Sequence, residues 1–183
     1  MHALNEPPQP AQNGHLRPTD QTPPRWTAAV VLLLALPWLN PLTAGPSASA
    51  VPLLLSWTCT ALVLWWLTLS STPMRGVDWV RVLALAWSAA ALLSALIGLL
   101  QYVGLSAYAG GWMNVTGPGE AYGNLRQRNQ FATLMAIGLA SLLWWARRLP
   151  EPASLRGLWL GAALLGVGNA ASSSRTGLLQ WVA

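Results

Sequence analysis

Long apolar runs separated by short polar connections dominate the chain after residue 25. Two stretches carry no charged residue, from Trp26 to Met74 and from Val82 to Gly119. A helix needs about 20 predominantly apolar residues to cross the roughly 30 Å hydrocarbon core of a bilayer. The pattern therefore predicts about five membrane-spanning helices, near residues 26–44, 51–70, 79–103, 129–146 and 157–172, and the start of a sixth near Thr176.

The spans at either end of this pattern have the weakest signals. Pro37, Asn40 and Pro41 should kink the first span or end it early, because proline removes a helical hydrogen bond. A signal peptide is an alternative for this segment, with the Ala-Ser-Ala run at residues 48–50 as its small-residue cleavage site. The sixth span is cut off at Ala183, which indicates a truncated membrane protein.

Residues 1–25 have a different character. They contain seven proline or glycine residues among Gln, Asn and Thr and show no hydrophobic periodicity, as is typical of disordered segments. We therefore expect a disordered tail, residues 1–25, followed by one membrane-embedded part, residues 26–183. Within this part, residues 104–128 form a connection outside the membrane.

The composition excludes a soluble domain. Hydrophobic residues make up 54% of the chain and charged residues only 8%, whereas a typical globular domain has about 25% charged residues. The excess apolar side chains must face lipid. The fold class that we expect is an all-α, polytopic transmembrane helical bundle.

The net charge of +5 does not indicate a nucleic-acid partner. All ten basic residues are Arg, and they stand singly or in pairs between long uncharged runs, as is typical of charges that set membrane topology. A His/Cys metal centre is excluded for this chain, since Cys59 is its one cysteine and His2 and His15 lie in the tail. We expect no cofactor, and no transport by a charge relay, because ionisable groups are almost absent from the predicted spans.

The Arg residues are unequally divided between the two sides of the predicted membrane. The tail side has seven: Arg17, Arg25, Arg75, Arg81, Arg147, Arg148 and Arg156. The other side has three: Arg126, Arg128 and Arg175. The positive-inside rule therefore places the N-terminus in the cytoplasm and the 104–128 connection outside. An aromatic belt is expected near the span ends on the cytoplasmic side, from Trp26, Trp65, Trp66, Trp79, Trp144, Trp145 and Trp159.

Residues 117–132, G-P-G-E-A-Y-G-N-L-R-Q-R-N-Q-F-A, form the first candidate site. A glycine-rich turn runs into six polar side chains just before the fourth span: Asn124, Arg126, Gln127, Arg128, Asn129 and Gln130. Guanidinium groups match phosphate oxygens in a two-pronged fashion, and amides can donate to the same anion or to sugar hydroxyls. A helix that begins near Asn124 would add the partial positive charge of its exposed N–H groups. The segment is therefore suited to an anionic head group at the membrane surface.

A structural interpretation of the same residues remains open. The two arginines could extend to the interface as anchors, and the amides could cap the helix that follows. Arg126 and Arg128 are two residues apart and point to different faces of a helix. At most one of them would then face a bound ligand.

Residues 169–177, N-A-A-S-S-S-R-T-G, form the second candidate site, on the same predicted side. Three consecutive serines precede Arg175 and interrupt the apolar run. A nucleophilic serine is one interpretation, but the segment contains no His or carboxylate to activate it. Hydrogen-bonding serines beside an anion-binding Arg175 are the preferred interpretation.

The run G-N-L-R-Q-R-N-Q-F-A, residues 123–132, resembles the G-N-x-x-Q-x-N signature of bacterial protein glycosylation ligases, the pilin-type O-oligosaccharyltransferases. The run S-S-R-T-G, residues 173–177, is similar to a segment of the wider O-antigen ligase and polymerase superfamily. By position, Gly123, Asn124, Gln127 and Asn129 match the signature and Arg175 matches the superfamily arginine. Arg126 and Arg128 occupy variable positions of the signature.

The resemblance implies a multi-pass enzyme of the bacterial inner membrane that transfers oligosaccharide from an undecaprenyl-diphosphate carrier to a hydroxyl acceptor on the periplasmic face. The acceptor could be a pilin-like protein, a lipid core or a growing polysaccharide. The expected donor-binding residues are Asn124, Arg126, Gln127, Arg128, Asn129 and Arg175. The catalytic base of the family is a His on a later periplasmic loop, so it is expected to lie outside this chain.

A non-enzymatic role is the alternative. A small membrane scaffold, or a subunit whose polar loop binds lipid head groups, would show the same polar segment at a span end. A reading frame that continues into several more spans and a His-containing loop would favour the ligase, whereas a natural stop after Ala183 would favour the scaffold.

Overall fold

The computed structural model describes residues 26–42, 50–69, 78–149 and 152–182. Within these ranges the secondary structure is entirely helical, in agreement with the predicted all-α class. Three short 3₁₀ helices lie between the third and fourth α-helices: η1 (Leu105–Tyr108), η2 (Gly110–Trp112) and η3 (Gly123–Leu125). The α-helices are α1 (Trp26–Leu39), α2 (Val51–Leu69), α3 (Trp79–Tyr102), α4 (Arg128–Ala146), α5 (Pro152–Ala171) and α6 (Arg175–Val182). The predicted tail, residues 1–25, lies outside the described residues.

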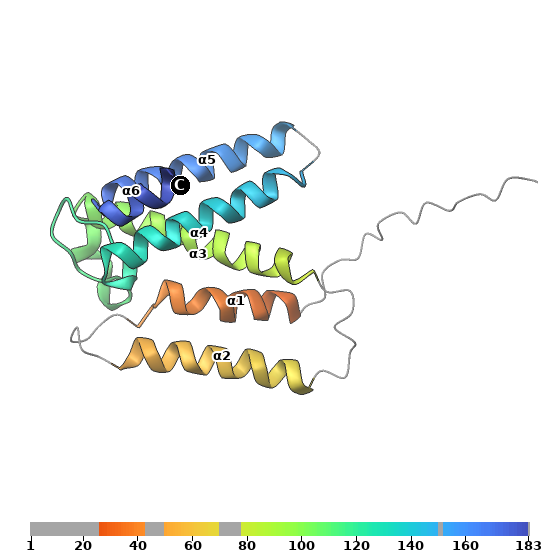
Figure 1. The fold of residues 1–183 in the computed structure, drawn as a ribbon. Helices are drawn as coiled ribbons and strands as arrows, with labels where there is room; N and C mark the ends of the chain where they lie inside the picture. Colours follow the sequence, from red (N-terminus) through yellow and green to blue (C-terminus); the bar gives the residue numbers. More distant parts are fainter. Residues whose placement is uncertain (1–25, 43–49, 70–77, 150–151, 183) are drawn as a thin grey trace, which may run out of the picture.

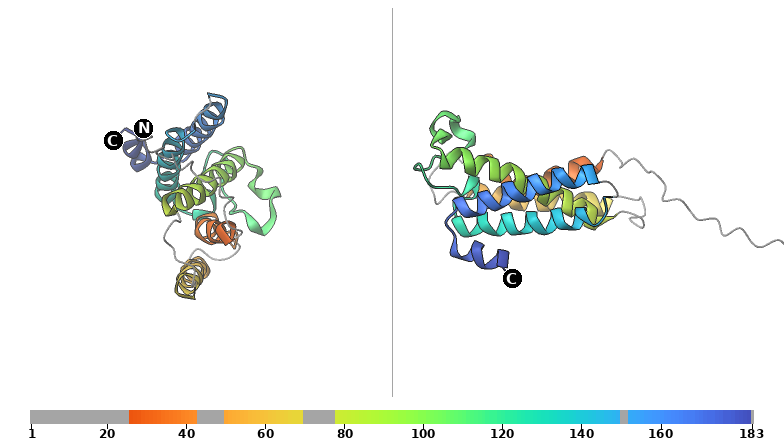
Figure 2. Two further views of the ribbon diagram at one scale, coloured as in Figure 1. Left: turned by 90° about the vertical axis from the view of Figure 1, so that its right-hand side faces the viewer. Right: turned by 90° about the horizontal axis from the view of Figure 1, so that it is seen from above.

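Helices α1 to α5 run alternately in opposite directions and form an elongated bundle (Figure 1). The C-terminal ends of α1, α3 and α5 therefore lie at the same end as the start of α4. We call this the motif end, because it carries residues 103–127. Figure 2 shows that α2 lies at the edge of the bundle, on the far side of α1 from the other helices, and that α6 turns back along the outside of α4.

Two of the helices in the described ranges, α2 and α3, are long and apolar enough to cross a membrane. Most apolar side chains of α2 are exposed, which indicates membrane association rather than a place in a soluble core. The prediction of about five spans is not confirmed. Helix α1 has only 14 residues, and it ends before Asn40 and Pro41, as the sequence predicted. Helices α4 and α5 have 19 and 20 residues but include polar residues such as Arg128 and Asn169, and α6 has 8.

Small residues bring α3, α4 and α5 close together. Ala86, Ala90, Ala91 and Ala95 of α3 are fully buried. A Cβ atom added at Gly138 of α4 would overlap the Cβ of Ala91. Close approach through small side chains is the usual way in which helices associate in lipid, where van der Waals packing drives association.

Aromatic and basic side chains gather at the end opposite the motif end. The ring centroids of Trp26 and Trp66 are 4.7 Å apart, and Trp79 lies 6.5 Å from Trp26. The guanidinium of Arg148 lies 3.7 Å from the ring centroid of Trp144, a cation–π contact. The structure thus brings predicted belt residues from separate helices to one end of the bundle.

Candidate functional site

The first predicted motif folds as a tight turn followed by a helix. Gly123 begins η3 with a φ of 58°, and Arg126 ends it in the left-handed region with a φ of 60°. The buried Phe131 ring lies against Gly123, where a Cβ atom would come within 3.1 Å of it, so glycine suits this position for both its space and its backbone. Helix α4 begins at Arg128, within one residue of the predicted start of the fourth span, so a helix that begins near Asn124 is not observed.

Asn124 holds this turn to two neighbouring segments. Its side chain is buried and its Nδ2 donates to the carbonyl oxygens of Leu39 (3.1 Å) and Trp112 (2.9 Å). Its Oδ1 accepts from the backbone N–H of Asn114 at 2.9 Å. These three bonds use both ends of the amide, so Asn124 connects the end of α1, the connection after η2 and the motif turn.

Two further buried amides, Gln101 and Asn40, bind the same turn, and neither side chain was among the predicted site residues. Asn40, just after α1, donates from Nδ2 to the Asn124 carbonyl at 3.0 Å. Gln101, in the last turn of α3, bonds to the backbone of Asn114, Tyr122 and Gly123. The available signal for Gln101 was an amide that interrupts an apolar run at the end of a predicted span.

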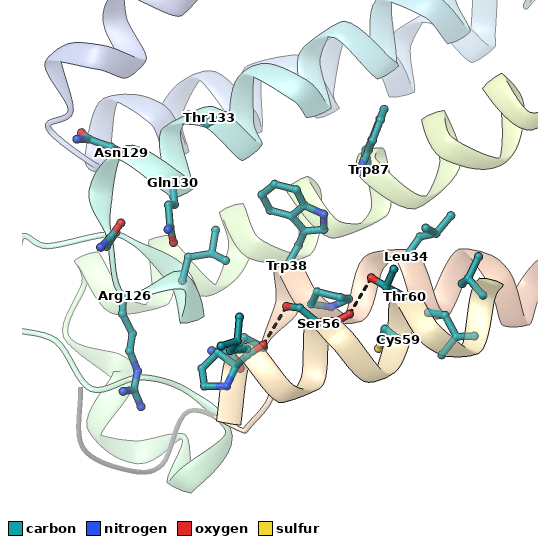
Figure 3. A pocket seen from close by; sticks show the side chains of 18 of the residues that line it. Leu34, Trp38, Ser56, Cys59, Thr60, Trp87, Arg126, Asn129, Gln130 and Thr133 are labelled. Carbon is teal, nitrogen blue, oxygen red and sulfur yellow. Dashed lines mark hydrogen bonds between the residues drawn. The ribbon is translucent and has the colours of Figure 1, made fainter. Parts of the chain in front are cut away.

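A groove of about 1010 Å³ extends from the motif end along α1 and α2 (Figure 3). Its walls are mostly apolar and include Leu34, Trp38, Leu53, Val63, Leu64 and Trp87. Two hydroxyls in the wall are bonded within α2, since Ser56 donates to the Pro52 carbonyl and Thr60 to the Ser56 carbonyl. These bonds leave the helix wall with few unsatisfied polar atoms.

The polar end of the groove is formed by the first predicted motif. Arg126, Gln127 and Asn129 line it, together with Gln130 and Thr133. Gln127 stands at the N-cap position of α4 but makes no side-chain capping bond, which contradicts the capping interpretation for this residue. The structure therefore brings three of the six predicted donor-binding residues to one surface, and Asn124 lies buried behind them.

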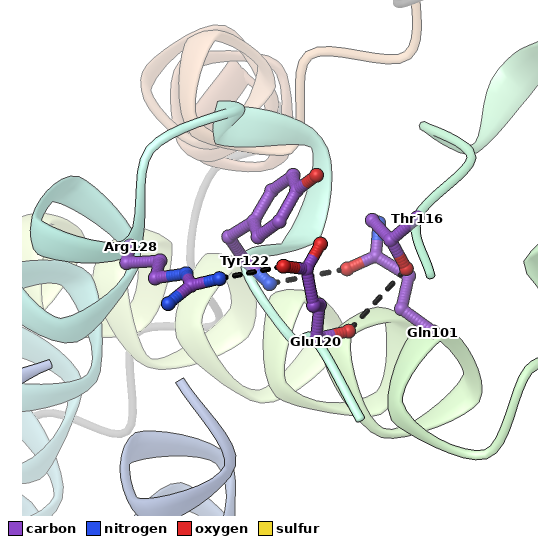
Figure 4. A network of polar contacts seen from close by, with 5 residues as sticks. All are labelled: Gln101, Thr116, Glu120, Tyr122 and Arg128. Carbon is purple, nitrogen blue, oxygen red and sulfur yellow. Dashed lines mark hydrogen bonds and ion pairs between the residues drawn. The ribbon is translucent and has the colours of Figure 1, made fainter. Parts of the chain in front are cut away.

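Arg128 lies outside the groove lining and forms an ion pair with Glu120. Its Nη2 is 2.6 Å from Glu120 Oε1, and both side chains are partly exposed (Figure 4). Burial, and next the Glu120 carboxylate, raise the pKa of the neighbouring Tyr122 phenol above its usual value, and Arg128 offsets part of this rise. The phenol therefore stays protonated at neutral pH and keeps its ability to donate a hydrogen bond.

A side-chain hydrogen bond connects the second predicted motif to the first. Ser174 donates from Oγ to Oδ1 of Asn129 at 2.9 Å. The same Oγ accepts the backbone N–H of Gly177 at 3.2 Å, so Ser174 also caps α6. Ser172 is buried and donates to the Asn169 carbonyl at 2.6 Å. These hydroxyls hold the turn between α5 and α6 and attach it to α4.

Arg175 is the first residue of α6 and is exposed. It does not line the groove, but it follows Ser174, which bonds to the groove residue Asn129. Within the described ranges, no group of three or more His, Cys, Asp or Glu side chains is placed to hold a metal ion.

Comparison with known protein families matches residues 121–146 to the family described as protein glycosylation ligase. The matched segment covers the motif turn and the whole of α4, and so includes all five polar residues at the end of the groove. No curated protein and no solved structure matches the chain. The short family match supports a relation to the ligases.

Proposed function

We propose that this chain is part of a membrane-embedded glycosylation ligase that transfers oligosaccharide from an undecaprenyl-diphosphate carrier to a hydroxyl acceptor. One observation carries this proposal. An apolar groove ends at Arg126, Gln127 and Asn129, and these residues belong to the segment that matches the ligase family. The donor in such a reaction has the same division into a long apolar chain and an anionic, sugar-bearing head.

The apolar walls suit the isoprenoid chain of the donor. Leu34, Val63 and Leu64 line the groove on α1 and α2. If α2 crosses the membrane, the groove runs across the hydrocarbon core. Burying hydrocarbon against such walls stabilises a complex by about 25 cal/mol for each Å² removed from water. The gain is smaller in a membrane, because the isoprenoid chain moves from lipid rather than from water. The walls therefore orient the isoprenoid chain more than they increase the affinity.

The polar end suits the diphosphate. Arg126 can present a guanidinium to its oxygens, and Gln127, Asn129 and Gln130 can donate from their amides. Helix α4 begins at Arg128, so its first N–H groups and its dipole also face this end. When a diphosphate leaves an anomeric carbon, negative charge grows on its oxygens, and groups fixed in advance at that position stabilise it without a metal ion.

The residues outside the groove have supporting roles in this proposal. Arg175 approaches the diphosphate from α6, which Ser174 attaches to Asn129. Asn124 positions the turn rather than binding the donor, because its amide is already bonded to three backbone groups. The acceptor is a protein Ser or Thr, and the base that deprotonates it comes from a later loop of the full-length enzyme.

The membrane topology belongs to the same proposal. The chain contributes about five spans of a bacterial inner-membrane protein, with the N-terminus in the cytoplasm and the motif end in the periplasm. The Arg residues support this orientation, since Arg81, Arg147, Arg148 and Arg156 lie towards one end of the bundle and Arg126, Arg128 and Arg175 towards the other.

A transfer assay on the reconstituted full-length protein tests the function. Gln127→Ala and Asn129→Ala should lower transfer from a lipid-diphosphate-linked oligosaccharide to a pilin-type acceptor, while membrane abundance stays near that of the wild type. Arg147→Ala, at the other end of the bundle, is the control and should retain full transfer. Binding of the donor without any transfer by the wild type would favour the scaffold instead.

A further inference from the structure

We propose that Gln101 is a positioning residue that fixes the motif turn so that Arg126 and Gln127 face the groove, and thereby sets the affinity for the donor head group. The inference rests on the proposed function and assigns a role to a residue outside the segment that matches the ligase family. Gln101 is fully buried in the last turn of α3.

The Gln101 side chain makes four hydrogen bonds, all to backbone atoms. Its Nε2 donates to the carbonyl oxygens of Asn114 and Gly123, each at 2.9 Å. Its Oε1 accepts from the backbone N–H of Tyr122 at 3.2 Å (Figure 4). The same oxygen accepts from the backbone N–H of Gly123 at 2.8 Å. Both ends of the amide are therefore used, and Gly123 is held through its N–H and its carbonyl at once.

The position of Gly123 controls where Arg126 lies. Gly123 starts the single turn of η3, and Arg126 follows directly after that turn in a left-handed conformation. The Phe131 ring lies against Gly123 on one side, so the turn is held between α3 and α4. A displacement of Gly123 would move Arg126 and Gln127 relative to the groove wall.

Glutamine is suited to this position by its length and its hydrogen-bonding groups. A side chain of similar size without polar atoms would leave two carbonyls and two N–H groups of the connection without these partners. Buried groups of this kind seek other partners, which requires the backbone to move. Asn124 also holds the connection at Asn114. Its side chain accepts a hydrogen bond from the Asn114 N–H, and Gln101 donates to the Asn114 carbonyl.

The first test separates positioning from stability in the full-length protein. Gln101→Met keeps the size of the side chain and removes all four bonds. We expect the KM for the lipid-diphosphate donor to rise roughly ten- to hundredfold, because a displacement of about 1 Å at a binding group has effects of this size. The KM for the acceptor should change little.

The control is Leu142→Ala, which removes a buried side chain of α4 far from the motif end. It should lower the thermal stability in detergent at least as much as Gln101→Met does, and it should leave the donor KM unchanged. If Gln101→Met and Leu142→Ala shift the donor KM equally, or if neither shifts it, Gln101 has only a structural role.

A second measurement does not depend on the enzymatic activity. The probe is a cysteine introduced by Gln127→Cys in a Cys59→Ala background. Its rate of reaction with a charged, membrane-impermeant thiol reagent is measured. Adding Gln101→Met should change this rate several-fold, whereas adding Leu142→Ala should leave it unchanged. An unchanged rate would overturn the positioning role. A changed rate in a protein whose wild type transfers no glycan would refute the proposed function and retain the control of the turn by Gln101.

Discussion

Arg126 and Arg128 are separated by one residue but have different surroundings. Arg126 adopts a left-handed backbone conformation and lines the groove. Arg128 starts α4 and pairs with Glu120. The sequence predicted that at most one of the two would face a ligand, on the argument that both lie on a helix. The structure separates them for another reason, because the turn before α4 directs Arg126 towards the groove.

A substitution that keeps the turn tests the role of the Arg126 side chain. Glycine adopts a φ of 60° without steric cost, so Arg126→Gly removes the guanidinium and leaves the backbone conformation available. We expect transfer to fall roughly ten- to hundredfold, since a charge-assisted hydrogen bond contributes about 1.5 to 3 kcal/mol. Arg128→Ala should reduce transfer less than about tenfold, because an exposed ion pair contributes at most about 1 kcal/mol. Equal losses in the two variants would contradict the assignment.

Arg175 tests whether the second motif contributes to anion binding. If Arg175 binds the diphosphate, Arg175→Lys should transfer poorly, because an ammonium keeps the charge but loses the planar, two-pronged geometry. Arg175→Ala should be worse. An interfacial anchor would accept Lys freely. Transfer assays on both variants distinguish the two roles, and a wild-type rate for Arg175→Lys would leave only the anchor.

The sequence could identify the groove residues better than the residues that support them. Gln127, Asn129 and Arg126 form a dense polar group at a predicted span end. Because they are close together in the sequence, the sequence alone is enough to recognise them. Gln101 and Asn40 instead bond to backbone atoms that are distant in the sequence. Gln101 and Gly123 are 22 residues apart, and Asn40 and Asn124 are 84 residues apart. No sequence period specifies such pairs, since they depend on how the ends of α1 and α3 meet.

At the scale of elements, the apolar runs specified the helices closely. Helices α2 and α3 end within one residue of the predicted spans, because an uninterrupted apolar run favours a continuous helix. The connection from 103 to 127 was less predictable. It folds as three short 3₁₀ helices, and the hydrogen bonds of Asn124 and Gln101, rather than a local pattern, determine its path.

The packing of α6 against α4 and α5 depends on Gly177. A Cβ atom at this position would overlap Oδ1 of Asn169 and Cβ of Ala132. Gly177→Ala should therefore lower the free energy of unfolding by about 1 to 3 kcal/mol, as overpacking does. Gly157→Ala on α5 is the matched control, since its Cβ would meet no atom within 4 Å and helix propensity then favours Ala by up to about 1 kcal/mol. Thermal unfolding in detergent that is identical for the two variants would contradict this packing.

At the scale of the whole molecule, the orientation that we propose for the protein in the membrane rests on the Arg residues at the two ends of the bundle. Reporter fusions at Gly110 or Gly119 should be active outside the cytoplasm, and fusions at Ser71 or Pro150 should be active inside it. A single cysteine placed at Gly119 gives an independent measurement. Labelling of this cysteine by a reagent confined to the cytoplasm would refute the orientation.

The central claim is that the groove between α1 and α2 holds the apolar chain of a lipid-diphosphate glycan whose head group lies at the motif end. A photo-crosslinking amino acid placed at Val63, which lines the groove, tests it against the same amino acid at Leu62, which is exposed elsewhere on α2. In the full-length protein in membranes, a radiolabelled donor should crosslink at Val63, and excess unlabelled donor should abolish this labelling. Equal labelling at Leu62 and Val63, or labelling at Val63 that the unlabelled donor does not reduce, would contradict the account.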